Sequence, residues 1–160
     1  MSKLCPSAQP GMDRAMILGV VQQAGPRPVV EYVNERVPAT PKILAMAAPL
    51  KPTEVFRLAA TCAEHKCPHF DGANCQLATR VVRILPAVVD RLPPCVIRKE
   101  CRWYSQEGEA ACKRCPEITT ISYDLSAQVR EVSGLPVTEE PIALAAFSDD
   151  GYLVSGAAET

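Results

Sequence analysis

The stretches TCAEHKCPHFDGANC (residues 61–75) and CVIRKECRWYSQEGEAACKRC (residues 95–115) hold seven of the eight cysteines of this chain. The eighth, Cys5, stands alone near the N-terminus. Cysteines at such density are typical of a metal site or of a disulfide framework. The sequence therefore predicts a cysteine-rich core, and its flanking helical patterns place that core at residues 53–116.

Three short helices are predicted to carry this core. Thr53 offers an N-cap oxygen, and apolar residues then recur at helical spacing, which predicts a helix over residues 53–66. A stronger amphipathic pattern predicts a second helix over residues 73–92, with a kink at Pro86. A third helix is predicted over residues 106–113.

The segment before the core reads as β-structure. Apolar residues 15–21 and 29–33 are separated by a turn rich in glycine and proline, which predicts a hairpin. Residues 37–52 contain four prolines and are predicted to be a connecting loop.

The segment after the core again has β character. Residues 118–123 and 129–132 are predicted strands, and residues 142–147 and 152–154 flank an Asp-Gly pair that favours a hairpin turn. The predicted fold is therefore α+β: a helical cysteine-rich centre flanked by N- and C-terminal β-hairpins, in a single domain over residues 1–160.

Composition narrows the class of protein. The 160 residues carry a formal net charge of -1, and 48% of them are hydrophobic, so neither a disordered chain nor a strongly basic nucleic-acid binder is indicated. Proline, glycine or charge interrupts every apolar run before it reaches bilayer-spanning length, so no membrane segment is expected. The N-terminal apolar run lacks the flanks of a secretory signal. We therefore expect a cytoplasmic protein, in which thiols stay reduced and clustered cysteines bind metal more often than they form disulfides.

The spacing of the cysteines separates two kinds of metal site. Structural zinc sites usually present two short Cys-x-x-Cys or Cys/His knuckles. Here only Cys112 and Cys115 have that spacing, and the other gaps within the two cysteine-rich stretches are four, seven, five and ten residues long. Iron-sulfur clusters accept thiolates from more widely spaced loops and helix ends. The irregular spacing therefore favours iron-sulfur clusters, with zinc as the alternative.

Three cysteines are followed directly by proline, namely Cys5, Cys67 and Cys115. At these dipeptides the chain resembles bacterial ferredoxins, whose ligand run ends in Cys-Pro. The chain lacks the Cys-x-x-Cys-x-x-Cys run of that family, so the resemblance implies a ligand type, thiolates on one or two [4Fe-4S] clusters, and no fold.

Eight thiols divide into two sets of four. Cys95, Cys101, Cys112 and Cys115 form one local set. The remaining candidate ligands are Cys62, Cys67 and Cys75, with Cys5, His65 or His69 as the fourth; we favour Cys5. One cluster drawn from both sets, with the spare cysteines buried as small apolar side chains, satisfies the same chemistry.

The charges near the local set allow two interpretations. Arg98, Lys99, Arg102, Lys113 and Arg114 surround it, opposed by Glu100, Glu107 and Glu109. The cations can stabilise a negatively charged cluster, or they can form an ordinary solvated face.

The expected function is that of a small iron-sulfur protein for electron transfer or redox sensing, which works with a redox partner protein and is not a substrate-converting enzyme. The alternative is a zinc-stabilised module for interaction or nucleic-acid binding, with Trp103 or Tyr104 stacking on bases. A third possibility is a thiol oxidoreductase that uses Cys112 and Cys115, although such a pair should open a helix and here is predicted to close one.

Overall fold

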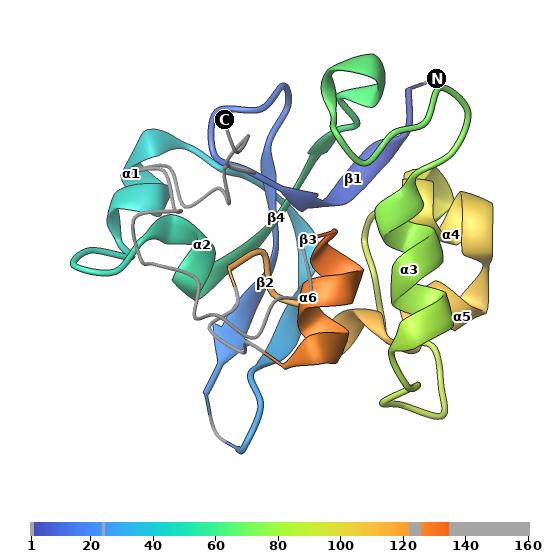
Figure 1. Cartoon of the computed structure of the whole chain (residues 1–160). Helices are drawn as coiled ribbons and strands as arrows, with labels where there is room; N and C mark the ends of the chain where they lie inside the picture. The colour runs from blue at the N-terminus through green and yellow to red at the C-terminus, as the bar shows by residue number, and fades with distance from the viewer. Residues whose placement is uncertain (1, 24, 122–125, 135–160) are drawn as a thin grey trace, which may run out of the picture.

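A four-stranded antiparallel sheet forms the centre of the molecule (Figure 1). The computed structural model describes residues 2–23, 25–121 and 126–134. The strand order is β1-β4-β2-β3, so the two central strands come from different parts of the chain. The strands are β1 (Leu4–Ala8), β2 (Met16–Gln22), β3 (Val29–Pro38) and β4 (Phe56–Thr61).

Helices lie on both sides of this sheet, which makes the described part of the chain α+β (Figure 1). On one side lie two short helices, α1 (Pro41–Ala45) and α2 (Pro52–Val55). On the other side lie α3 (Gln76–Ile84), α4 (Arg102–Glu107) and α5 (Glu109–Cys112), and α6 (Ala127–Ser133) packs against α3. Single 3-10 turns occur at η1 (Glu64–Lys66), η2 (Arg98–Glu100) and η3 (Cys115–Glu117).

Each face of the sheet has its own hydrophobic core, because successive side chains of a strand point to opposite faces. Leu18 and Ala59 pack with the residues of α3, α4 and α5. Ile17 and Leu58, their neighbours in sequence, pack with partly buried residues of α1. The central strands are thus covered on both faces.

The predicted N-terminal hairpin is confirmed. Strands β2 and β3 pair antiparallel, and β3 extends five residues beyond the prediction, to Pro38. The following loop is partly wrong, because α1 forms within it: Thr40 caps this helix by accepting a hydrogen bond from the backbone N–H of Ile43 at 3.3 Å.

The predicted helix over residues 53–66 is wrong. Within this range only residues 53–55 are α-helical, as part of α2, and Glu64–Lys66 form the 3-10 turn η1. Between them the chain forms β4, the strand that pairs with both β1 and β2. Leu58, Ala59 and Ala60 have no exposed surface. An apolar run that is buried on every side has no polar face, so its periodicity does not distinguish a strand from a helix.

The other two core helices are shorter than predicted. Helix α3 ends at Ile84 and does not continue with a kink, because Leu85 precedes Pro86 and takes an extended conformation. The predicted helix over residues 106–113 is instead two helices, which meet at Gly108 with a φ of 67°. A positive φ favours glycine and interrupts the helical hydrogen bonds.

The predicted strands after the core are wrong where they can be compared. Residues 118–121 form no strand, and residues 129–132 lie within α6. The predicted C-terminal hairpin at 142–147 and 152–154 lies outside the described residues. Among the residues that are described, no helix has the length and apolar character to cross a membrane.

Candidate functional site

Four cysteines that are far apart in sequence lie around one hollow. Cys5, Cys62, Cys67 and Cys75, which we call the outer set, line a cavity of about 620 Å³. Ligand pockets in proteins commonly measure roughly 300–1,000 Å³. The outer set therefore surrounds a space large enough for a bound group.

Pairing between β1 and β4 brings the first two of these cysteines together. Cys5 lies opposite Ala60 in the sheet, and the backbone N–H of Cys62 donates to the carbonyl of Lys3 at 2.9 Å. Cys5 therefore joins the set through the sheet, although 56 residues separate it from Cys62 in the sequence.

A closed loop presents the other two. Asp71 Oδ1 accepts hydrogen bonds from the backbone N–H groups of Ala73 and Asn74, at 2.9 and 2.7 Å, and these bonds lower the pKa of its carboxyl. The loop leads to Cys75, which is the N-cap of α3. The Gln106 side chain from α4 fixes this position by accepting from the Cys75 N–H and donating to its carbonyl.

The outer thiols influence one another electrostatically. Burial, with smaller contributions from the charges of Cys62, Cys75 and Cys67, raises the pKa of Cys5 to about 12, although a hydrogen bond from the Ser7 backbone opposes this rise. Burial is also the main reason that the pKa of Cys75 is raised. Four thiols so close together do not ionise together in a buried site unless a cation compensates them.

Neither candidate histidine is needed to complete this set, because Cys5 already provides a fourth thiol. His65 is exposed and packs edge-on against Phe70, with ring centroids 5.5 Å apart. His69 lines the cavity, but its Nδ1 is 2.8 Å from Arg80 Nη2. Burial and then the charge of Arg80 lower the pKa of His69.

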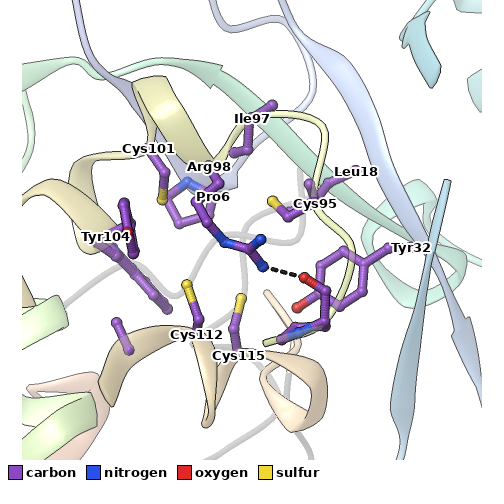
Figure 2. Close-up of a pocket in the computed structure, with 13 residues that line it drawn as sticks. Pro6, Leu18, Tyr32, Cys95, Ile97, Arg98, Cys101, Tyr104, Cys112 and Cys115 are labelled. Atoms are coloured by element: carbon purple, nitrogen blue, oxygen red, sulfur yellow. Dashed lines mark hydrogen bonds between the residues drawn. The ribbon is translucent and has the colours of Figure 1, made fainter. Parts of the chain in front are cut away.

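The remaining four cysteines form a second group. Cys95, Cys101, Cys112 and Cys115, which we call the inner set, line a separate hollow (Figure 2). They come from helix ends and turns: Cys101 is the N-cap of α4, Cys112 is the last residue of α5, and Cys115 opens η3. Burial raises the pKa of Cys95, and it raises the pKa of Cys101 to about 12.

A buried arginine from the centre of the sheet lies beside the inner set. Arg57 of β4 has no exposed surface. Its guanidinium donates to the carbonyls of Pro6, Cys115 and Ile118 at 2.6–2.8 Å, and Nη2 lies 3.1 Å from Cys115 Sγ. Burial alone would lower the pKa of Arg57, but the charges of Cys115 and Tyr32 beside it raise that pKa.

No carboxylate in the described part of the chain forms an ion pair with Arg57. Buried charges in proteins are normally paired, because moving an isolated charge out of water is very costly. The groups that act on Arg57 and can become anionic are the thiols of Cys115 and Cys101 and the Tyr32 hydroxyl. The arginine therefore favours an ionised inner set.

A second arginine fills the space between the inner sulfurs. Figure 2 shows the Arg98 guanidinium among the four cysteines, with a hydrogen bond to the carbonyl of Pro93. Its hydrogen bond to Cys112 opposes the rise that burial causes in the pKa of that thiol. The cavity that remains measures about 20 Å³, roughly the space of one water molecule.

The two sets are neighbours. Leu4 and Cys101 form a parallel β-bridge, so the Cα atoms of Cys5 and Cys101 are at most about 9 Å apart. Trp103, which is 1% exposed, lines both hollows, and its Nε1–H has no hydrogen-bond partner among the described residues. Trp103 and the bridge between Leu4 and Cys101 thus form a wall that the two sets share.

The donor chemistry of each set fits an iron-sulfur cluster. Each offers four free thiols, and backbone N–H groups point at sulfurs of both, for example from Ala78 to Cys75 and from Tyr104 to Cys101. Across the described ranges, no three His, Cys, Asp or Glu side chains converge closely enough to hold a single metal ion. A cluster differs from a single ion because its irons each take one thiolate, so the sulfurs need not meet at a common atom. The outer cavity has room for such a cluster, whereas Arg98 occupies the space between the inner sulfurs and would have to move aside for one.

The predicted basic residues have different places in the structure. Arg98 belongs to the inner hollow, whereas Arg102 faces the other way, 2.8 Å from Glu64, and lines the outer cavity. Arg114 donates to the carbonyls of Leu85 and Ala110. The other charged residues that the sequence predicted near the inner set are Lys99, Lys113, Glu100, Glu107 and Glu109.

Sequence reasoning missed Arg57, Arg80 and Tyr32. Arg57 had a signal, since it is a charged residue directly before the apolar run at residues 58–60. A charged residue at such a position is either exposed to solvent or buried beside a compensating partner. Because residues 53–66 were predicted to be a helix, the second interpretation was overlooked. Tyr32 carried no signal, because only the strand pairing brings it near Cys115.

Comparisons with protein-family models, with curated proteins and with solved structures find no match to this chain.

Proposed function

We propose that this protein holds two iron-sulfur clusters, one in each set of four cysteines, and uses them for electron transfer or redox sensing. One observation carries the proposal: the eight cysteines divide into two groups of four, each around its own hollow, with none left over. Four thiolates are the usual complement of one [4Fe-4S] cluster.

The buried Arg57 gives independent support. A fully buried guanidinium 3.1 Å from a cysteine sulfur, with no carboxylate paired to it in the described part, is compensated if the inner thiols are thiolates. Metal binding deprotonates cysteine, so a cluster supplies that charge. Thiols with raised pKa values do not ionise at neutral pH without such a partner.

The clusters supply one-electron redox chemistry, and the chain supplies their ligands, their hydrogen-bond donors and their shielding from water. We infer a carrier or sensor, not an enzyme, because the two hollows already account for the thiols and basic residues that sequence analysis singled out. The proposal includes a redox partner protein and a reducing compartment such as the cytoplasm.

The test is a visible spectrum with iron, sulfide and zinc analysis on full-length protein purified without oxygen. The proposal predicts a broad charge-transfer band and iron and sulfide in comparable amounts, at about eight of each per chain. Colourless protein that contains zinc, or no metal, contradicts it and leaves a zinc-stabilised module or a set of buried thiols.

A further inference from the structure

The two cysteine sets differ in the cations and hydrogen-bond donors that surround their sulfurs and can stabilise negative charge. Next to the inner set lie Arg57, which is fully buried, and the hydroxyl of Tyr32. Among the described residues, no side chain donates a hydrogen bond to a sulfur of the outer set; the bonds found there come from backbone N–H groups, of Ser7 to Cys5 and of Ala78 and Leu77 to Cys75.

Three cations, Lys66, Arg80 and Arg102, line the outer cavity, but in the described part of the chain none of them donates a hydrogen bond to an outer sulfur. Arg80 influences Cys75, but its guanidinium bonds to the carbonyl of Val132 and to His69 Nδ1. It keeps some exposure to solvent, which weakens its effect on nearby charges. The outer set also opens onto the larger cavity.

We propose that Arg57 sets the inner cluster at a higher reduction potential than the outer cluster, so that an electron entering at the outer set moves inward. The inference rests on the proposed function. Reduction adds one negative charge to a cluster, and a buried cation hydrogen-bonded to a ligand sulfur stabilises the reduced form. Arg57 is a positioning residue: it acts on the cluster through Cys115.

The electron balance is simple. A low-potential one-electron donor, a reduced redox protein, reduces the outer cluster by one electron. The outer cluster is then oxidised by passing that electron to the inner cluster, which is reduced. The wall that contains Trp103 and the bridge between Leu4 and Cys101 keeps the two sets within a short distance of each other.

Variants that can hold only one of the two clusters allow the reduction potential of each cluster to be measured separately. Cys67→Ser leaves the inner set complete, and Cys112→Ser leaves the outer set complete. Arg57→Gln is introduced into each background, and the reconstituted full-length proteins are titrated anaerobically with dithionite while EPR follows the reduced cluster.

The expected result is that Arg57→Gln lowers the inner potential enough to change the ratio of reduced to oxidised cluster at least tenfold at a fixed applied potential, about 59 mV for one electron. In the Cys112→Ser background the ratio should change less than threefold, since Arg57 contacts no outer sulfur. Without the arginine change, the inner cluster should be reduced at the higher potential. An unchanged inner potential, equal shifts in both backgrounds, or the reverse order of potentials overturns the inference.

Arg57 also binds three backbone carbonyls, so its replacement can destabilise the fold. Two further variants therefore distinguish loss of the fold from loss of the positive charge. Arg57→Lys keeps the charge and should retain most of the inner potential. Tyr32→Phe removes only the hydroxyl beside Cys115 and should shift the inner potential downward by a smaller amount; if Arg57→Gln does not fold, no shift in Tyr32→Phe overturns the inference. Protein that binds no iron would instead refute the proposed function.

Discussion

Replacing Cys5 by serine should remove one cluster and leave the other. Cys5 belongs to the outer set only through the pairing of β1 with β4, and it contributes nothing to the inner hollow. Loss of one of four ligands should release the outer cluster, so iron should fall from about eight to about four atoms per chain.

The fold should survive this change. A serine hydroxyl at the half-buried Cys5 position costs about 1–3 kcal/mol if it finds no partner. Domains are typically stable by about 5–15 kcal/mol, so most molecules should remain folded. Far-UV circular dichroism separates loss of ligand from loss of fold.

The assay is iron and sulfide analysis of the variant after anaerobic reconstitution, with His69→Ala as the matched control. His69 lines the same cavity but is bonded to Arg80, so its loss should leave about eight irons. Full iron in Cys5→Ser, or half the iron in His69→Ala, would show that the fourth outer ligand has been misidentified.

Three other outcomes follow from the structure. Cys112→Ser should also halve the iron while the outer set keeps its cluster; an unchanged iron content together with lost disulfide-exchange activity would instead support a thiol oxidoreductase. Gly19→Ala should lower stability by about 1–3 kcal/mol, or about 2–4 °C in Tm for each kcal/mol, because a Cβ at this position would lie 2.6 Å from the backbone oxygen of Glu31; an unchanged thermal midpoint would contradict this packing. Thr53→Val should stabilise the protein by about 1 kcal/mol, because the Thr53 hydroxyl is buried without a hydrogen-bond partner in the described part of the chain; a lower Tm would reveal a bond that the structure does not record.

The sequence predicted the grouping of the cysteines better than it predicted the elements that carry them. Chain proximity alone puts Cys95, Cys101, Cys112 and Cys115 together, and the structure gathers the same four. Cys5 could be assigned to the other set only by counting, since its strand had not been recognised. Whether either set binds a metal stays a prediction.

Local patterns failed where tertiary contacts decide the conformation. The sequence of β4 has apolar residues at helical spacing, but the pairing of this strand with β1 and β2 and its burial on both faces outweigh its helical propensity. Gly108 and Pro86 were visible as helix breakers, and giving them more weight would have corrected both boundaries. Arg57 and Tyr32, which lie beside the inner set, come from strands, and no local pattern connects a strand to a distant cysteine.

The strand order also has a consequence for assembly. The inner ligands span only residues 95–115, so they can meet by closing short loops. The outer ligands require Cys5 to reach residues 62–75, and closing a longer loop costs more chain entropy and slows the search. During reconstitution from the unfolded chain, the inner centre should therefore acquire its iron first, and the outer centre should follow only once β1 has docked at the edge of the sheet.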